Sequence, residues 1–497
     1  MIRCALGVDI GTSSSKGVLV TEDGRVAASA AIEHQVARPR PGWVEMDADL
    51  WWAEFAELTA RLLAQIPDAE VTAVGVSGMG PCVLLADEDD RPVRAAILYG
   101  VDARATEQIA HLTRHLGAAQ IVSSGGSSLT TQAAGPKIQW VRDEEPDAYA
   151  RAVRLFMPAS WLVRRLTGAY VLDHHSASQC TPLYDIEQHE WREDWWTRIA
   201  GGLERPRLVW PHEVVGTVTA EAATRTGLTA GTPVIAGTID AWTEAISAGA
   251  ARPGDLMLMY GTTMFLVATG TDALRTPSMW TTVGAFPGTM CLAGGLATSG
   301  ALTDWWRGIA GVGYETLLGE AAQSPVGADG LLTLPYFAGE RTPILDPDAR
   351  GIVAGLTLAH TRGDLYRSAL EATAFGVRHN VETMRAAGAD IRRVVAVGGG
   401  TRGELWLQIV SDVTGLTQEV PQVTVGASYG AAFLAASATA DDAPDISVWN
   451  PRAHTIHPNP VATEEYDSLF AQYLSLYATT KSIQHDLARR QRARTRD

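Results

Sequence analysis

The sequence predicts an α/β protein built from two related domains that face one another across a cleft. Two observations lead to this prediction. A run of apolar strand, Gly-Thr turn and second apolar strand occurs at residues 5–20 and again at residues 255–269. Each half also holds an apolar strand that enters a glycine-rich turn, within residues 71–80 and 394–415. A strand and turn pattern that occurs once in each half of a chain indicates two related domains.

Composition and charge narrow the classes of protein. With 497 residues, of which 46% are hydrophobic and 19% charged, the chain is long enough for two or three folded domains. We expect a first domain over residues 1–245, a second over 246–440 and a helical extension over 441–497. The formal net charge of −16 argues against nucleic acid or an anionic membrane as the main partner, because both need a basic face.

The cysteines and the apolar runs indicate where the protein works. Its four cysteines are widely separated and form no CxxC pair, which suits a reduced compartment and excludes a zinc knuckle. No apolar run approaches the ~18 residues of a membrane span, and an acid follows the N-terminus too soon for a signal peptide. We therefore expect a cytoplasmic protein and leave a homodimer open. The cysteines are Cys4, Cys82, Cys180 and Cys291.

The first hairpin carries polar groups in its turn. Apolar stretches at 5–8 and 18–20 predict two strands, so the GTSSSK segment between them lies in a hairpin loop. Backbone N–H groups, hydroxyls and one lysine suit phosphate oxygens, and Asp9 would hold a divalent cation against them. The same composition is also usual in turns without a ligand. The residues expected to contact phosphate are Gly11, Thr12, Ser13, Ser14 and Lys16.

Asp240 lies in a turn between a strand at residues 234–236 and a helix expected from residue 241. The end of a strand is where α/β enzymes place catalytic groups. An aspartate just before a helix is equally suited to capping it. The position alone leaves both interpretations open.

Three glycines, from Gly398 to Gly400, follow a strand and precede a helix whose apolar face includes Ile409 and Val413. A dinucleotide-binding fold is one alternative for such a run. The spacing is GGGxxG rather than GxGxxG, and no acidic residue ends a strand ~20 residues later, which argues against that fold. A flat ligand against the backbone and tight packing of strand on helix both remain open.

Two further segments invite functions that we do not favour. The pair His174–His175 has no further His or Cys at ligand spacing, so we expect an exposed polar loop rather than a metal site. The basic end at 488–497 follows aromatic residues at helical spacing, which indicates a docked final helix with a solvated end rather than a nucleic-acid tail.

Residues 351–371, GIVAGLTLAHTRGDLYRSALE, resemble the C-terminal signature of the FGGY family of carbohydrate kinases in the actin-like ATPase superfamily. GERTP at 339–343 resembles the xylulokinase-like branch, and KIQWVRDE from Lys137 fits half of the N-terminal signature. The resemblance spans about residues 3–480. It implies two actin-like ATPase (ribonuclease H-like) domains, ATP and Mg²⁺ as cofactors, and phosphorylation of a sugar hydroxyl, most nearly in a ketopentose such as D-xylulose.

The resemblance also implies roles for individual residues. The first hairpin would meet the ATP phosphates, with Asp9 at the metal, and Asp240 would be both the catalytic base and a metal neighbour. A sugar hydroxyl is a weak nucleophile, so a carboxylate that accepts its proton fits in-line transfer. The residues expected around the nucleotide are Gly261 and Thr262 in the second hairpin, Gly300 and Asp304, and Gly399, Gly400 and Glu404 over the adenosine.

The sugar is less well defined. The resemblance implies substrate contacts from Met79, Gly80, Pro81, Asp102 and Arg104. Xylulokinases carry a Met-His pair at the position of Gly80 and Pro81, and glycerol kinases an Arg-Glu pair, so ribulose, gluconate, glycerol and erythritol stay open as substrates. Asp102 and Arg104 also fit a surface ion pair. The segment 123–135 fits a sugar-facing loop or a flexible turn. A non-catalytic nucleotide switch is the alternative of another class.

Overall fold

The computed structural model describes residues 1–494, and residues 495–497 lie outside the described part of the chain. The predicted basic end at 488–497 falls partly on those last residues. Contacts divide the chain into two compact units. The first comprises residues 1–252, 271–291 and 425–451, and the second comprises residues 253–270, 292–424 and 452–497. The assignment of the sugar to residues 1–245 and of the nucleotide to 246–440 stays a prediction.

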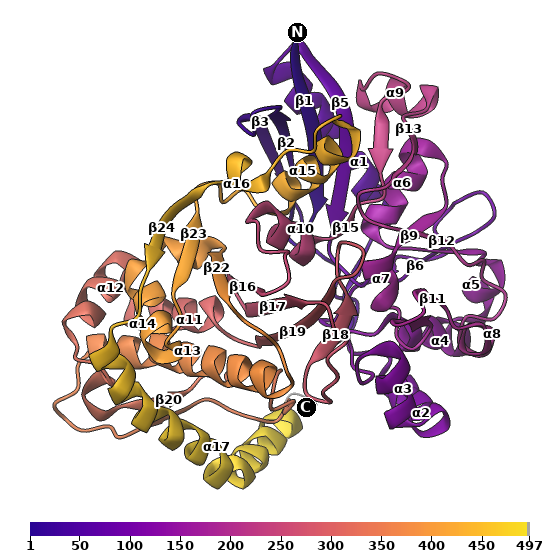
Figure 1. Cartoon of the computed structure of the whole chain (residues 1–497). Helices are drawn as coiled ribbons and strands as arrows, with labels where there is room; N and C mark the ends of the chain where they lie inside the picture. Colours follow the sequence, from indigo (N-terminus) through magenta and orange to yellow (C-terminus); the bar gives the residue numbers. More distant parts are fainter. Residues whose placement is uncertain (495–497) are drawn as a thin grey trace. The chain divides into compact units, whose positions relative to one another are not determined.

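The first unit is built on one sheet, whose strands run in the order β13-β14-β5-β1-β2-β3 (Figure 1). The strands β1 and β2 form the predicted antiparallel hairpin, and β5 runs parallel to β1 on its other side. The short strand β15 pairs with the end of β5. These strands are β1 (Ile2–Ile10), β2 (Ser14–Thr21), β3 (Val26–Glu33), β5 (Ala69–Gly78), β13 (Val214–Thr217), β14 (Pro233–Ile235) and β15 (Thr238–Ile239).

Helices cover both faces of this sheet. On one face, Gly17 lies against leucines of α1 (Ala48–Gln65). On the other face, a Cβ atom at Gly7 would lie 1.9 Å from the carbonyl oxygen of Ser428 in α15 (Ala427–Thr439), so only glycine permits this approach. Because both faces are covered, β1 is buried continuously from Cys4 to Ile10.

Shorter elements surround the sheet of the first unit. Its other helices are α2 (Thr106–Leu116), α3 (Ala118–Gly125), α4 (Ala134–Glu144), α5 (Pro146–Arg151), α6 (Pro158–Thr167), α7 (His174–Ser178), α8 (Glu193–Ile199), α9 (Ala220–Thr226), α10 (Asp240–Ser247) and α16 (Ile446–Trp449). Its other strands are β4 (Glu45–Met46), β6 (Leu84–Ala86), β7 (Ala96–Ile97), β8 (Arg154–Phe156), β9 (Val171–Asp173), β10 (Tyr184–Asp185), β11 (Glu190–Trp191), β12 (Arg207–Val209) and β18 (Trp280–Val283).

The second unit repeats the central arrangement. Its strands run in the order β19-β17-β16-β22-β23-β24. The strands β16 and β17 form the second predicted hairpin, and β22 runs parallel to β16. These strands are β16 (Asp255–Tyr260), β17 (Met264–Gly270), β19 (Met290–Leu296), β22 (Arg393–Val397), β23 (Gln418–Pro421) and β24 (Arg452–Ile456). The predicted α/β class, with a strand hairpin beside a parallel strand in each half, is confirmed.

The helices of the second unit include the expected final helix. In α17 (Pro460–Arg494) the side chains of Tyr466, Phe470 and Tyr473 are buried, which confirms a docked helix. The hydroxyl of Tyr466 donates to Glu371 in α13 at 2.7 Å. The remaining elements are α11 (Gly300–Ala310), α12 (Tyr314–Gln323), α13 (Arg362–Ala386), α14 (Glu404–Thr414), β20 (Leu332–Leu334), β21 (Ile352–Ala354) and the 3₁₀ turns Ala328–Gly330 and Gly399–Arg402.

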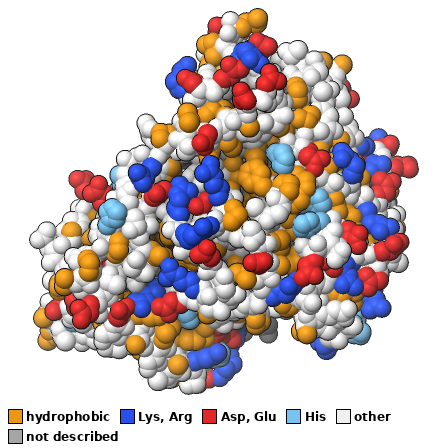
Figure 2. Space-filling view, viewed as in Figure 1, with side chains coloured by type: hydrophobic (Ala, Val, Ile, Leu, Met, Phe, Trp, Pro, Cys, Tyr) orange, Lys and Arg blue, Asp and Glu red, His pale blue; other side chains and the backbone are white. Residues whose placement is uncertain are grey.

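Two further features of the fold are the charges on its surface and the hydropathy of its helices. Acidic and basic side chains are interspersed over the face shown in Figure 2. Within residues 1–494, no helix is both long enough and apolar enough to cross a membrane.

Candidate active site

Asp9 lies near the end of β1, where the neighbouring strand supplies a hydrogen bond. Ser77 of β5 lies directly across from it, and the Ser77 hydroxyl donates to Asp9 Oδ1 at 2.6 Å. Burial raises the pKa of Asp9, while the bond from Ser77 and the positive charge of Lys16 oppose that rise. Asp9 is therefore a buried carboxylate at the edge of the sheet, with the hydroxyl of Ser77 and the positive charge of Lys16 both favouring its ionised form.

Asp240 reaches the same edge through β15. Thr238 in β15 pairs with Ser77 of β5, and Asp240 follows two residues later as the first residue of α10. Ile239 occupies the N-cap position, so the alternative that Asp240 caps this helix is wrong. The Asp240 carboxylate accepts a hydrogen bond from the Ala241 N–H at 2.7 Å. Burial first, and the charge of Asp9 second, raise its pKa to about 7.

Asp173 holds the strand that leads to Asp240. Its carboxylate accepts from the Thr238 hydroxyl at 2.7 Å and from the Ser176 N–H at 3.0 Å. Burial raises the pKa of Asp173 to about 6. Asp173 is not among the residues that the sequence predicts at the site, although it ends β9 and directly precedes α7, a position between strand and helix like that of Asp240.

His175 corrects the expectation of an exposed polar loop at residues 174–175. It lies in α7 and is completely buried. Its ring lies 3.7 Å, between centroids, from that of Trp242 in α10, and its Nδ1 lies 2.7 Å from the carbonyl oxygen of Val283. Burial lowers its pKa to about 3, so the ring is neutral and serves packing.

Glu244 is a further acidic residue that the sequence analysis missed. It lies one helical turn after Asp240 in α10, where spacing by four residues places it on the same face. Burial, and then the charge of Asp9, raise its pKa to about 7, while a hydrogen bond from the Ala427 N–H opposes the rise. Its position four residues after an expected catalytic aspartate was the available signal.

The first turn is shorter than the sequence predicts, because β2 begins at Ser14 and only residues 11–13 lie between the two strands. The Gly11 N–H donates to the carbonyl oxygen of Ser14 at 3.1 Å, which closes the hairpin loop. Ser13 and Lys16 are exposed, and the hydroxyl of Thr12 lies 2.9 Å from the Tyr99 hydroxyl. Hydroxyls thus lie in one short loop, and Lys16 lies beside it near the start of β2.

Met79 and Gly80 lie beside this turn. The Met79 N–H donates to the Ile10 carbonyl at 2.8 Å, and Met79 Sδ lies 3.8 Å from the Thr12 hydroxyl. A Cβ atom at Gly80 would lie 2.6 Å from Ile239, the residue before Asp240. Pro81 follows through a cis peptide bond and is buried. The structure therefore places this segment between the hairpin turn and the start of α10.

Asp102 and Arg104 form an ion pair, but the pair is buried rather than on the surface. Neither side chain has exposed area, and Arg104 Nη2 lies 2.7 Å from Asp102 Oδ2. The same Asp102 oxygen accepts from the Val44 N–H at 2.6 Å. Arg104 also donates to Glu45 at 2.6 Å and lies over the ring of Trp43. These groups satisfy one another within the protein, so the pair holds its segment in place.

The segment 123–135 is anchored rather than free. The Ser127 hydroxyl accepts from the Thr281 N–H at 3.0 Å and donates to the Thr281 carbonyl at 3.2 Å. Ser127 and Gln132 line a pocket of about 30 Å³ with Gln179 and Thr282. Contact of this segment with sugar stays a prediction.

In the second unit, the second turn contacts the start of α11. The Gly300 N–H donates to the Gly261 carbonyl at 2.9 Å, and the Ala301 N–H donates to the Thr262 carbonyl at 3.0 Å. A Cβ atom at Gly300 would lie 2.6 Å from the Gly261 carbonyl oxygen. Three of the residues expected at the nucleotide are thus brought together by backbone contacts.

The glycine run after β22 lies at the same edge of this sheet, because β16 and β22 are parallel neighbours. A Cβ atom at Gly400 would lie 2.8 Å from both Tyr260 and Trp406, whereas one at Gly399 would meet no atom within 4 Å. Packing thus accounts for Gly400 and leaves one side of Gly399 open. Glu404 begins α14 and is exposed.

Asp304 lies one turn into α11 and is exposed. Its carboxylate pairs with Arg307 at 2.6 Å and accepts from the Tyr314 hydroxyl at 3.1 Å. These bonds hold the carboxylate on the surface of α11. The structure gives no contact between it and Gly261 or Thr262 among the described bonds.

The carboxylates limit what metal the site can hold. No group of three or more His, Cys, Asp or Glu side chains suited to a metal ion occurs within residues 1–494. Asp9 and Asp240 interact electrostatically and are oxygen donors, the ligand type that Mg²⁺ prefers. Mg²⁺ is usually held by one or two carboxylates together with substrate phosphates, so these two residues fit it.

Comparison with known proteins identifies the family. Residues 4–247 match the N-terminal domain, and residues 256–439 the C-terminal domain, of the "FGGY family of carbohydrate kinases". "Xylulose kinase" of Bacillus subtilis is 28% identical over 97% of this chain and 98% of its own length. "Glycerol kinase" of Nocardia farcinica is 31% identical over 88% of this chain and 90% of its own.

A solved structure agrees with these matches over nearly the whole chain. The crystal structure of xylulose kinase from Rhodospirillum rubrum is similar with a TM-score of 0.91 at 31% identity, covering 97% of this chain and all of that one (100%). The two-domain actin-like fold expected from the resemblance is therefore confirmed. The chain belongs to the FGGY family of carbohydrate kinases and is an ATP-dependent sugar phosphotransferase.

Proposed function

We propose that this sugar kinase transfers the terminal phosphoryl group of ATP to a hydroxyl of a ketopentose such as D-xylulose, with Asp240 as the general base. The observation that carries the proposal is the Asp240 carboxylate, whose pKa is raised to about 7 by burial and by Asp9. A base with a pKa near the working pH combines an ionised form with enough basicity to take a proton. Asp240 accepts the proton of the sugar hydroxyl as the bond to phosphorus forms.

The first turn binds the phosphates. The loop and the first residues of β2 offer the backbone N–H group of Thr12, the hydroxyls of Thr12, Ser13 and Ser14, and the ammonium group of Lys16. Such donors meet the charge that spreads over the oxygens of a transferring phosphoryl group. The exposure of Ser13 and Lys16 supports this role, because a ligand can reach both.

Asp9 and Asp240 hold Mg²⁺ beside the phosphates. When bound, Mg²⁺ neutralises charge on the phosphate oxygens and orients them. Two buried carboxylates that repel one another favour a nearby cation, and the raised pKa of Asp240 reflects burial first and that repulsion second. The Ser77 hydroxyl fixes one oxygen of Asp9 and leaves the other for the ion.

The second unit contacts the rest of the nucleotide. Gly261, Thr262 and Gly300 share one backbone cluster, and Asp304 follows one turn further along α11. Gly399, Gly400 and Glu404 cover the adenosine. The open side of Gly399 supports this assignment, because a flat ring needs backbone without a Cβ atom. On this basis residues 1–245 bind sugar and phosphate, and residues 246–440 bind the nucleotide.

The sugar contacts Met79, Gly80 and Pro81. Their place beside Thr12 and Ile239 supports this proposal, since the substrate hydroxyl must lie near Asp240. Asp102 and Arg104 act through the segment that they hold, because they have no exposed surface for direct contact. Gly80 and Pro81 offer no side-chain hydrogen-bond donor, so other polyols, ketoses and aldonates are the second candidate substrates.

Release of ADP tests the proposal, measured with ATP and Mg²⁺ over a panel of pentuloses, polyols and aldonates. We expect turnover that depends on the added sugar, with D-xylulose giving the highest kcat/KM. A higher kcat/KM with D-ribulose, gluconate, glycerol or erythritol would keep the mechanism and replace the substrate. Folded protein that releases ADP at one rate with and without every compound would contradict the proposal and favour a nucleotide switch.

A further inference from the structure

Three polar residues lie beneath the first turn and take no part in the proposed chemistry. His34 follows β3, Glu54 lies in α1 and Ser15 lies in β2, and all three side chains are buried. His34 Nδ1 lies 3.0 Å from Glu54 Oε2, and His34 Nε2 lies 3.0 Å from the carbonyl oxygen of Gly11. The Ser15 hydroxyl donates to Glu54 Oε2 at 2.5 Å.

The hydrogen bonds of His34 fix the number of protons in this cluster. The carbonyl oxygen of Gly11 accepts hydrogen bonds and cannot donate them. The Glu54 carboxylate, which also accepts a hydrogen bond from the Ser15 hydroxyl, is likewise an acceptor. Each nitrogen of the imidazole therefore needs a proton between itself and its oxygen partner. A neutral imidazole beside an ionised carboxylate has one proton too few for both bonds.

These bonds also set the direction of the turn. In a trans peptide the C=O and the following N–H point in opposite directions. Because His34 holds the Gly11 carbonyl, the Thr12 N–H points away from His34. The His34 backbone N–H donates to the Ser13 carbonyl at 3.0 Å, so the same residue grips the turn at a second point.

We propose that His34 is a positioning residue for the phosphate-binding turn and acts in its doubly protonated form, paired with Glu54. The proposal rests on the proposed function of the turn. In this proposal His34 does not touch substrate. It keeps the N–H of Thr12 pointing outward from the cluster. An imidazolium also cancels the negative charge of the Glu54 carboxylate, so the pair places no net negative charge beneath the site of an anionic ligand.

Glu54 is the charged group that faces His34. Glu54 lies in α1, and further along α1 Arg61 pairs with Glu57 at 2.5 Å. From β2 the ring's neighbour is the Ser15–Glu54 bond, since the next side chain, Lys16, is exposed. Loss of the bonds to the ring loosens the turn, and the KM for ATP then rises.

Nuclear magnetic resonance tests the proton count without any assumption about ATP. The chain has 12 histidines, so protein labelled with ¹⁵N-histidine gives a spectrum in which His34→Asn identifies one ring. At pH 7 we expect both ring nitrogens of His34 to show the shifts of protonated nitrogen. A ring with one protonated and one bare nitrogen would overturn the proposal.

Kinetics tests the positioning role. We expect His34→Asn to raise the KM for ATP roughly tenfold, the effect of losing about one buried hydrogen bond to a charged group, and to leave kcat within about threefold. His111→Asn, at a histidine in α2 that is not part of the cluster, is the matched control.

The two experiments separate the failure of this proposal from the failure of the proposed function. An unchanged KM for ATP in folded His34→Asn, with normal sugar-dependent turnover in the wild type, contradicts the positioning role alone. Absence of sugar-dependent turnover in the wild type contradicts the proposed function, whereas the spectrum still decides the protonation of His34. If His34→Asn does not fold, Glu54→Gln gives the kinetic test, with the same expected rise in KM.

Discussion

The two hairpins at the centres of the two units share a plan but differ in chemistry. In the first, Asp9 pairs across the hairpin with Lys16. In the second, the pair one residue before the end of β16 is Met259 with Phe265. The first turn closes with a bond from Gly11 to Ser14, and the second closes one residue sooner, from Gly261 to Thr263.

The supports of the two turns differ in the same way. Charged and polar side chains, from His34 and Glu54, hold the first turn from below. Backbone groups at the start of α11, on either side of Gly300, hold the second. One copy of the hairpin thus carries charged side chains, which we propose serve phosphate and metal, and the other has a turn held by backbone contacts, which we propose lies against the nucleotide. The predictions below test this division.

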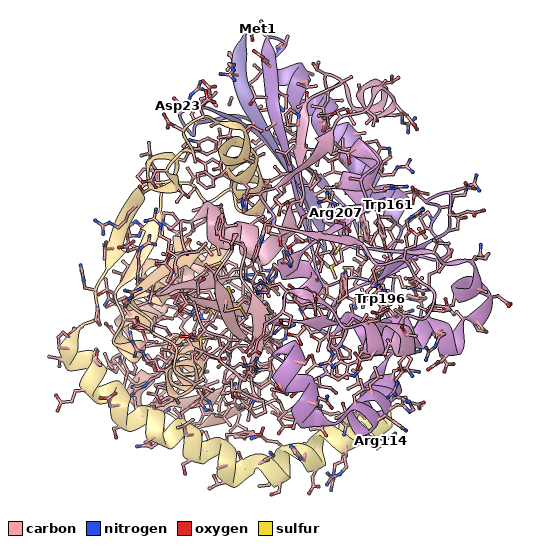
Figure 3. The ribbon with its side chains drawn as sticks, turned by 45° about the vertical axis from the view of Figure 1, so that its right-hand side comes forward. Met1, Asp23, Arg114, Trp161, Trp196 and Arg207 are labelled. Carbon is pink, nitrogen blue, oxygen red and sulfur yellow. The ribbon has the colours of Figure 1, made fainter. Side chains whose placement is uncertain are left out.

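The largest effect is expected from Asp9→Asn, which removes the charge of the first hairpin. Loss of the anionic metal ligand should lower kcat/KM by roughly 10²–10³-fold. Asp23→Asn is the control, because Asp23 is exposed in the turn at the other end of β2, where Figure 3 shows it at the same end of the sheet as Met1. If Asp9→Asn keeps more than about a tenth of the wild-type rate, Asp9 does not hold the metal.

The second hairpin is tested by Gly300→Ala. The new Cβ atom would lie 2.6 Å from the Gly261 carbonyl oxygen, so the turn and α11 must separate. We expect the KM for ATP to rise roughly tenfold or more, with a smaller change in kcat, because about two backbone hydrogen bonds are strained. Gly308→Ala, in the same helix with no atom within 4 Å of its Cβ position, is the matched control. If the two variants have equal KM values for ATP, the second turn does not contribute to nucleotide binding.

Asp240, whose pKa is raised by burial first and by Asp9 of the first hairpin second, should impose a pH dependence. The base must be ionised to accept a proton, and the pKa of Asp240 is raised to about 7 in the free enzyme. The value of kcat/KM for sugar should therefore rise about tenfold per pH unit below that pKa and level off above it. A profile that is flat between about pH 5.5 and 7.5 would show that no such group limits the reaction.

The smallest effect concerns stability. Glu244 has its pKa raised to about 7 in the folded state, so folded protein holds this proton more tightly than unfolded protein does. Its charged form then lowers the free energy of unfolding as pH rises from about 4.5 to 7. Glu244→Gln should raise that free energy by roughly 1–3 kcal/mol at pH 8 and leave it unchanged at pH 4. Urea unfolding without nucleotide measures this free energy, with Glu221→Gln in α9 as the control. Equal stability of wild type and Glu244→Gln at pH 8 would argue against a buried charge at Glu244.

Local patterns were enough to predict much of the fold. The two hairpins, β5, β22 and the helix that starts at Asp240 follow from apolar runs and turn residues. The pattern does not show which distant segment completes a core. The helix α15, late in the chain, packs on β1 because Gly7 admits its backbone, and nothing near Gly7 in the sequence indicates that partner.

The site was predictable to the same extent. Asp240 and the first turn stand out because polar groups interrupt apolar strands. His34 and Glu54 do not, because their role arises from a contact between α1 and the end of β3. The sequence predicts His175 at the surface, and for Asp102 and Arg104 it offers a surface ion pair only as the alternative to substrate contact. Their burial depends on Trp242 and on Trp43, which local sequence does not place beside them.

The most direct test of the account measures sugar-dependent ADP release and ATP binding in parallel for wild type and Asp240→Asn. Asn keeps the size of the side chain and cannot accept the proton from the sugar hydroxyl as a base. The account predicts a loss of roughly 10²–10⁴-fold in kcat while ATP still binds. An Asp240→Asn enzyme that keeps most of its wild-type rate would show that another group takes the proton, and the central claim would be wrong.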